Sequence, residues 1–242
     1  MQSVSPQYEA EEKITVNGNV DLYAVVFNRT TETDLTEDQL PQVDIYKYKQ
    51  VIFVGDSRTE FMENVLTGMG ESATKNVKFV CSAGKGLDWF TTTGWAQLYS
   101  IVQHDSNSIL SKKTAVIFNF GVNDLSKSAD YAEYYNWIAP QLKSKGCELY
   151  FMSVNPVNRL MLPNAGRADR SEAAVRSFNQ YMKANLSSAY TYIDMYSYLK
   201  STGYSFASDH YGTGTVDDGL HYTTRTYKRI FAKCMDSLRV PA

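Results

Sequence analysis

Short apolar runs alternate with longer amphipathic segments along most of the chain. The runs are rich in β-branched and aromatic residues and end at polar or glycine-containing turns, as buried strands do. We predict strands at residues 51–54, 77–81, 115–120, 148–154 and 191–194, one helix directly after the first strand, and further helices near 95–103, 131–145, 171–185 and 223–238. Pro140 is expected to kink or interrupt the helix near 131–145. Strands that alternate with helices predict βαβ units, and hence a parallel sheet with helices on both faces.

The first 48 residues follow a different pattern. Short alternating segments on either side of Asn17-Gly18 predict a β-hairpin with a type I′ turn. Residues 30–41 are polar and acidic, which is typical of a connection. We therefore expect residues 1–48 to form an N-terminal extension that packs on a main domain of residues 49–242.

Composition limits the classes of function. The 242 residues are 43% hydrophobic, which suits one sizeable α/β core. The net charge is −2 and no run of like charge stands out, so nucleic acid is not an expected partner. No apolar run approaches the roughly 18 residues of a membrane-spanning helix. The sequence also lacks a Walker loop, a dinucleotide-binding glycine motif and zinc-site spacings. We expect no metal, no cofactor and no membrane insertion.

Surface chemistry bears on where the protein works. Eighteen tyrosines and abundant Ser, Thr and Asn residues suggest a polar surface of the kind found on exported carbohydrate-active proteins. We expect a secreted or cell-surface protein whose signal peptide is not part of this sequence. The oligomeric state stays open.

Polar clusters follow the first three predicted strands. Ser57 comes directly after the first strand, Gly84 after the second and Asn123 after the third. Because the carboxyl ends of parallel strands meet at one edge of a sheet, these residues should lie close together. A fourth cluster, Asp218 to His221, precedes the last helix, and a loop there can reach the same edge.

Acyl transfer from an ester needs the residue types that these clusters supply. Ser57 would be the nucleophile, His221 its general base, and Asp218 the group that fixes the histidine tautomer. The backbone N–H groups of Ser57 and Gly84 and the side-chain amide of Asn123 would form an oxyanion hole.

Alternatives remain at three of these positions. Ser57 and Glu60 also fit the capping box that merely begins a helix. Asp217 competes with Asp218, although the D-x-x-H spacing favours Asp218, and Gly86 competes with Gly84, which is nearer the strand.

These clusters resemble the four sequence blocks of the SGNH (GDSL-type) hydrolase family. The blocks are Gly55-Asp56-Ser57, Gly84, Gly121-Val122-Asn123-Asp124 and Asp218-Gly219-Leu220-His221, in the family's order over residues 50–238. The resemblance implies a flavodoxin-like three-layer α/β/α sandwich with a five-stranded parallel sheet. It also implies a metal-independent serine esterase and gives the residues above the same roles.

The substrate is a separate question. Arg58 stands where the family's name-giving pattern has leucine, so it is either a candidate substrate contact or a solvated surface charge. Trp89 is either a stacking wall for a sugar or part of the core. Our first hypothesis is an esterase that removes short acyl groups, acetyl above all, from a carbohydrate or cell-wall glycan. The alternatives are an O-acyltransferase with the same catalytic triad, a lipase for longer chains, and a carbohydrate-binding protein on an inactive hydrolase fold.

Overall fold

The computed structural model describes residues 34–44, 47–105, 113–163, 168–208 and 217–238. The predicted hairpin around Asn17 and the histidine at position 210 lie outside these ranges. Among the described residues, no helix combines the length and apolar character needed to cross a membrane.

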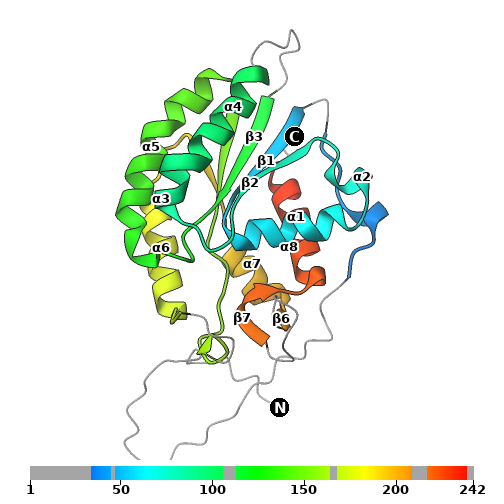
Figure 1. Cartoon of the computed structure of the whole chain (residues 1–242), viewed down its shortest axis with the longest axis vertical. Helices are drawn as coiled ribbons and strands as arrows, with labels where there is room; N and C mark the ends of the chain where they lie inside the picture. The colour runs from blue at the N-terminus through cyan, green and yellow to red at the C-terminus, as the bar shows by residue number, and fades with distance from the viewer. Residues whose placement is uncertain (1–33, 45–46, 106–112, 164–167, 209–216, 239–242) are drawn as a thin grey trace, which may run out of the picture.

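A five-stranded parallel sheet forms the centre of the molecule (Figure 1). Its strands are β1 (Tyr48–Gly55), β2 (Val77–Cys81), β3 (Lys113–Asn119), β4 (Cys147–Met152) and β5 (Tyr190–Ile193). They lie in the order β2-β1-β3-β4-β5, with every neighbouring pair parallel. This is the flavodoxin-like order, so the predicted fold class is confirmed.

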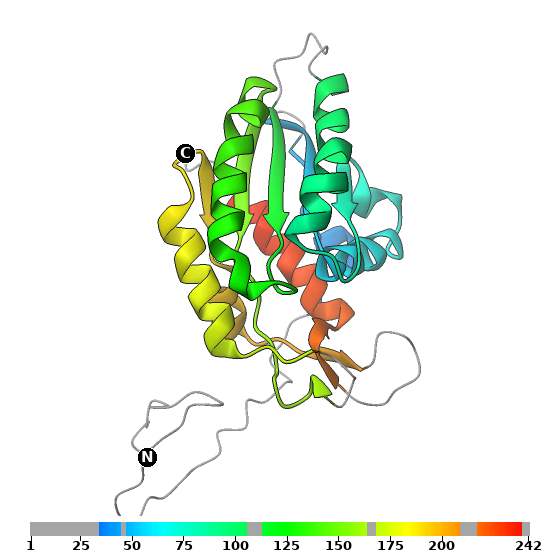
Figure 2. The same cartoon turned by 60° about the vertical axis from the view of Figure 1, so that its left-hand side comes forward.

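Helices cover both faces of the sheet, as the alternation of patterns predicts. One layer contains α4 (Trp95–Asp105), α5 (Ser128–Ser144) and α6 (Glu172–Asn185), and the other contains α1 (Ser57–Thr67), α7 (Met195–Thr202) and α8 (Thr224–Ser237). Figure 2 shows α5 and α6 in front of the sheet and α8 behind it. Successive strand residues point to opposite faces, so Ile52 and Val54 pack with the first layer whereas Val51 and Phe53 pack with the second. The core is therefore divided into two halves by the sheet.

Two features differ from the sequence-based expectation. Helix α5 is not interrupted at Pro140 but continues to Ser144, and Pro140 lies on the exposed side of the helix, where water can satisfy the carbonyl that loses its partner. The alternative, a kink at Pro140, stays a prediction. The segment expected to be a loop before the last helix is a strand, β7 (Asp217–Tyr222), which pairs antiparallel with β6 (Phe206–Ser208).

Shorter elements connect the layers. Helix α2 (Glu71–Thr74) precedes β2, and α3 (Leu87–Trp89) continues through a π-helical turn, Phe90–Gly94, into α4. Short 3-10 turns occur at Glu37–Gln39 and Leu125–Lys127.

The described part of the predicted N-terminal extension packs on the main domain. Leu40 and Val43 are buried in the half of the core that contains α1 and α8. Asp34 forms an ion pair with Lys228 of α8 at 3.1 Å. The boundary at residue 48 stays a prediction.

The ends of β1, β2 and β3 are level with one another. Gly55, the last residue of β1, is in register with Cys81 of β2 and with Asn119 of β3. The order of strands reverses between β1 and β3, and ligands of such sheets bind at this switch point. The segments that begin at Ser57, Gly84 and Asn123 therefore all start at that edge.

Candidate active site

Ser57 is the first residue of α1, directly beyond the end of β1. The Asp56 side chain caps this helix by accepting a hydrogen bond from the backbone N–H of Arg58 at 3.0 Å. The alternative capping box of Ser57 and Glu60 is wrong, because Glu60 instead accepts from the backbone N–H of Ala83 at 2.7 Å. The Ser57 hydroxyl therefore serves another purpose than capping, at the positive end of the helix dipole.

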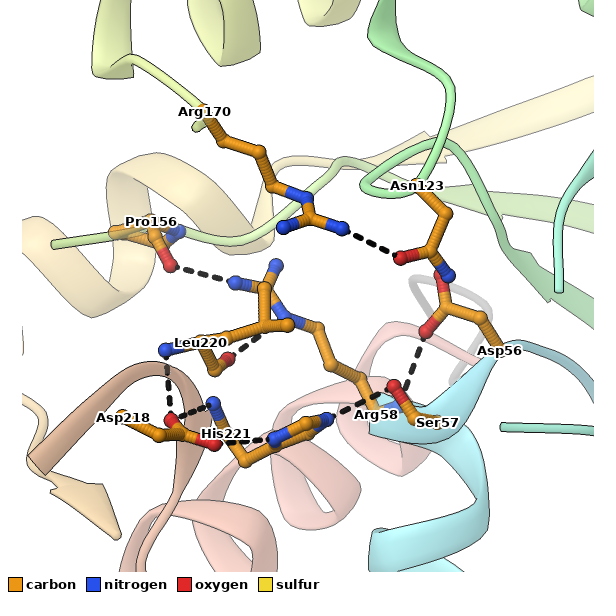
Figure 3. Close-up of polar contacts among 9 residues, drawn as sticks. All are labelled: Asp56, Ser57, Arg58, Asn123, Pro156, Arg170, Asp218, Leu220 and His221. Carbon is orange, nitrogen blue, oxygen red and sulfur yellow. Dashed lines mark hydrogen bonds and ion pairs between the residues drawn. The ribbon is translucent and has the colours of Figure 1, made fainter. Parts of the chain in front are cut away.

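The structure brings Ser57, His221 and Asp218 into one chain of hydrogen bonds (Figure 3). Ser57 Oγ lies 2.8 Å from His221 Nε2, and His221 Nδ1 lies 2.5 Å from Asp218 Oδ2. None of the three residues is more than 5% exposed, so water competes little for these bonds. The contacts join α1 to β7 across 164 positions of the sequence.

The hydrogen bonds around Asp218 determine which atoms of Asp218 and His221 are protonated. Burial would raise the pKa of the Asp218 carboxyl, but hydrogen bonds from the His221 ring and from two backbone N–H groups outweigh burial and lower this pKa. The ionised carboxylate only accepts hydrogen bonds, so the proton of a neutral ring lies on Nδ1 of His221. Nε2 can then accept from the Ser57 hydroxyl, which is the arrangement a general base requires.

Phe61 restricts the His221 ring from the side. The two rings meet edge to face, with centroids 4.5 Å apart and planes at 85°. Phe61 lies one helical turn beyond Ser57 on α1, so one helix face supplies both the hydroxyl and this wall. Sequence reasoning missed Phe61, although its i, i+4 spacing from Ser57 is a signal that could have found it.

The loop after β2 contains both candidate oxyanion glycines. Backbone N–H groups at positions 82, 83, 85 and 87 donate to acceptors within the described part of the chain. Gly84 has a φ of +70° and open space where a side chain would be, whereas a Cβ at Gly86 would lie 2.3 Å from the Asp124 carboxylate. Gly86 therefore packs inward, and Gly84, on the open side, remains the predicted donor.

Asn123 lies in the turn after β3 and contacts the glycine loop directly. Its Nδ2 donates to the carbonyl oxygen of Lys85 at 2.8 Å, and its Oδ1 accepts from Arg170 Nη2 at 3.0 Å. The two predicted oxyanion segments are thus joined by a hydrogen bond. Arg170 precedes α6, and no pattern in the sequence singled it out.

Arg58 does not have the position expected of a substrate contact or of a surface charge. It is 2% exposed, and its guanidinium group donates to the backbone carbonyls of Leu220, Asn155 and Pro156, each at 2.9 Å. It also lies over the ring of Tyr222, 5.3 Å from the centroid. The interpretation of Arg58 as a substrate residue is corrected by this burial. Arg58 ties the helix that begins at Ser57 to the strand that carries the histidine.

Replacing Arg58 by leucine should destabilise the protein. Leucine fills much of the space but donates no hydrogen bond. The Pro156 carbonyl still accepts from the Tyr222 hydroxyl, whereas the buried carbonyls of Leu220 and Asn155 lose the donors that Arg58 supplies, and each such loss costs about 1–3 kcal/mol. We expect the free energy of unfolding, measured by urea denaturation, to fall by at least about 2 kcal/mol. Leucine at Arg225, an exposed arginine of α8, is the control and should change it by less than about 0.5 kcal/mol. Equal stability of Arg58→Leu and wild type would contradict the inference that Arg58 links α1 to the strand that carries His221.

Asp56 is a buried carboxyl beside this arginine. Burial raises its pKa from 3.8 to about 6, although the charge of Arg58 and the hydrogen bond from the Arg58 backbone oppose the rise. Since the folded-state pKa is the higher one, this group stabilises the fold fully below about pH 4. That contribution is lost as the pH rises through 6.

Replacing Asp56 by asparagine should therefore stabilise the protein at alkaline pH. Asparagine keeps a capping oxygen but has no charge to bury. The difference between the two pKa values corresponds to about 3 kcal/mol, which sets the largest gain expected at pH 8. Urea denaturation at pH 8 and at pH 4 measures it, and the gain should vanish at pH 4. A loss of stability at pH 8 would show that the charged form is favoured in the fold.

Trp89 is the aromatic candidate for a substrate contact, and His104 is a further histidine among the described residues. Trp89, in α3, is partly buried, with its ring 6.1 Å from that of Phe120 in the core. One part of the ring therefore packs inward, and its contact with substrate stays a prediction. His104, on α4, contacts the Ser100 carbonyl at 2.6 Å and is not part of the Ser57–His221 pair.

The fold and the hydrogen-bonded Ser57, His221 and Asp218 define the class of this protein as a serine hydrolase. The GDSL-like lipase/acylhydrolase family matches residues 51–234. The chain belongs to this family, and the resemblance drawn from four short sequence blocks is confirmed. It is thus a serine esterase of the SGNH (GDSL) type.

The chain is similar to several solved structures of low sequence identity. A protein of Slackia heliotrinireducens assigned to the SGNH hydrolases is 12% identical, with a TM-score of 0.53 over 80% of this chain and 100% of its own. A protein from Bacteroides fragilis NCTC 9343 assigned to the acylhydrolases is 16% identical, with a TM-score of 0.49 over 83% of this chain and 92% of its own. The acetyl xylan esterase AlAXEase is 10% identical, with a TM-score of 0.49 over 78% of this chain and 100% of its own. No curated protein matches the chain.

Proposed function

We propose that this esterase hydrolyses esters of short acyl groups, acetyl above all, on a carbohydrate or cell-wall glycan. The proposal depends on one observation, the continuous hydrogen-bonded chain from Asp218 through His221 to Ser57 at the start of α1. Such a chain can deprotonate a serine hydroxyl at the moment it attacks.

In the proposed reaction, Ser57 Oγ attacks the ester carbonyl carbon while its proton passes to His221 Nε2. The carbonyl oxygen becomes an oxyanion, which the backbone N–H groups of Ser57 and Gly84 and the Asn123 amide stabilise. His221 then gives the proton to the leaving alcohol oxygen as the ester bond breaks. Water, deprotonated by His221, attacks the acyl-enzyme and releases the free acid together with Ser57. Asp218 stays ionised and stabilises the charged imidazolium in both steps.

The surroundings of Ser57 support a hydroxyl-rich substrate rather than a lipid. Asn123 and Arg170 place polar groups on one side of the site. Asp88 and Lys127 form an ion pair at 2.9 Å near Trp89, and the Asp88 side chain is 84% exposed. Trp89, the next residue after Asp88, is partly buried, and an indole with an accessible part is a surface on which a sugar ring can stack. These features favour a polar leaving group.

Acyl-chain selectivity tests this proposal. We expect turnover of nitrophenyl acetate and propionate, little turnover of octanoate and dodecanoate, and release of acetate from an acetylated xylo-oligosaccharide. Ser57→Ala is the matched control for each substrate. A preference for the long chains would contradict the short-acyl proposal and indicate a lipase. Acyl groups recovered on an added sugar, at the expense of free acid, would indicate an O-acyltransferase instead.

A further inference from the structure

The side-chain amide of Asn123 is held between two groups of opposite hydrogen-bonding character. Arginine has only donors, so the Nη2 atom of Arg170, 3.0 Å away, requires the oxygen of the amide to face it. The carbonyl oxygen of Lys85 only accepts, so the amide nitrogen faces that side, at 2.8 Å. Together these partners exclude the flipped orientation of the amide. Nδ2 carries two hydrogens, and the Lys85 carbonyl occupies one of them.

Arg170 is itself fixed by the backbone around it. Its Nε donates to the carbonyl of Val122 at 2.6 Å, one residue before Asn123, and its Nη1 donates to the carbonyl of Ala168 at 2.8 Å. The planar guanidinium therefore spans from the segment before α6 to the turn after β3. Ser171, the next residue, caps α6 by accepting from the Ala174 N–H at 3.1 Å. The arginine is thus attached at the start of a rigid helix.

The position of Arg170 is suited to act through Asn123 rather than on the serine. Figure 3 shows its side chain reaching toward Asn123 from the side of the site away from Asp218 and His221. A cation at the amide oxygen strengthens the N–H groups of the same amide as donors, because hydrogen bonds in a chain polarise one another. A donor strengthened in this way gains most when negative charge develops near it.

We propose that Arg170 is a positioning residue that orients the Asn123 amide toward the oxyanion and polarises it. This inference rests on the proposed function, in which Asn123 is an oxyanion donor. Because the oxyanion exists only in the transition state and the tetrahedral intermediate, Arg170 acts on kcat and leaves substrate binding nearly unchanged.

A double-mutant cycle on acetyl ester hydrolysis tests the proposal. Arg170→Met should lower kcat on the order of 10–100-fold, less than the 100–1,000-fold expected when the donor itself is removed. KM should change by less than about threefold. In an Asn123→Ala background, the same Arg170→Met change should cost less than about threefold, because the group that it orients is gone. Arg176→Met, further along α6, is the matched control and should retain the wild-type kcat.

Circular dichroism and thermal unfolding of each variant separate these effects from misfolding. If Arg170→Met costs the same factor with and without Asn123, or raises KM instead of lowering kcat, the proposal is overturned. Neither outcome affects the role of Ser57, which the Ser57→Ala variant tests independently. If Asn123→Ala retains wild-type kcat, Asn123 is not an oxyanion donor, and both the oxyanion assignment and the role of Arg170 are wrong.

Discussion

Replacing Ser57 by alanine should lower kcat for acetyl ester hydrolysis on the order of 10⁴–10⁶-fold, because the attacking oxygen is removed and no acyl-enzyme can form. His221→Ala should cost nearly as much, since the two residues act as one unit. Combining both changes should add little to either one. Steady-state kinetics with nitrophenyl acetate measure all three variants.

The fold should tolerate the Ser57→Ala change. Asp56, not Ser57, caps α1, so alanine at the first helical position removes no capping bond and has the highest helix propensity. We expect the midpoint of thermal unfolding to stay within a few degrees of the wild-type value. Wild-type turnover by a folded Ser57→Ala protein would contradict the assignment of the nucleophile.

Replacing Asn123 is expected to have the second-largest effect. Asn123→Ala removes an oxyanion donor and should lower kcat about 100–1,000-fold with KM nearly unchanged. Asn123→Asp is the matched variant, because a carboxylate can still accept the hydrogen bond from Arg170 but has no N–H group to donate. Above the pKa of the new carboxyl it also places a negative charge where the oxyanion develops. We therefore expect Asn123→Asp to be at least as slow as Asn123→Ala.

Stability measurements complete this test. If Asn123→Asp keeps wild-type kcat while remaining folded, the side-chain N–H is not used in the reaction. The oxyanion would then be stabilised by backbone groups alone, of which Gly84 is the predicted one.

Much of this site could be predicted from the sequence because the end of each apolar run marks the end of a strand. Each of these apolar runs stops at a glycine or a polar residue, and in a parallel sheet those stops lie along one edge, which brings the Ser57, Gly84 and Asn123 segments together. The spacing from Asp218 to His221 gave the third contact, since a short turn lets the carboxylate reach the ring three residues on. Local patterns were sufficient for these residues.

Other parts depend on contacts that no local pattern shows. Arg58 was assigned to the substrate or the surface because a charge in a sequence normally indicates exposure, but its acceptors are backbone carbonyls 97 to 162 positions away. Arg170 likewise reaches Asn123 across 47 positions. β7 was expected to be a loop because Asp217–Tyr222 is mostly polar and lacks the apolar alternation of a strand. Backbone acceptors leave no trace in side-chain composition.

One helix presents three of the side chains at the candidate site. Over its first turn and a half, α1 presents the Ser57 hydroxyl, the Arg58 guanidinium that holds the histidine strand, and the Phe61 ring against the imidazole. Small changes in the angle of α1 would therefore alter all three contacts together. Substitutions at Arg58 and Phe61 should therefore affect activity and stability jointly, whereas Ser57→Ala should affect activity alone.

The central claim is that Ser57 is the nucleophile activated by His221, and covalent labelling tests it most directly. A fluorophosphonate forms a bond from phosphorus to the attacking serine oxygen, fluoride leaves, and His221 takes the serine proton. Intact-protein and peptide mass spectrometry should show a single adduct on Ser57, none in Ser57→Ala, and much slower labelling in His221→Ala. An adduct on a different residue, or none on Ser57 while esters are still hydrolysed, would contradict the account.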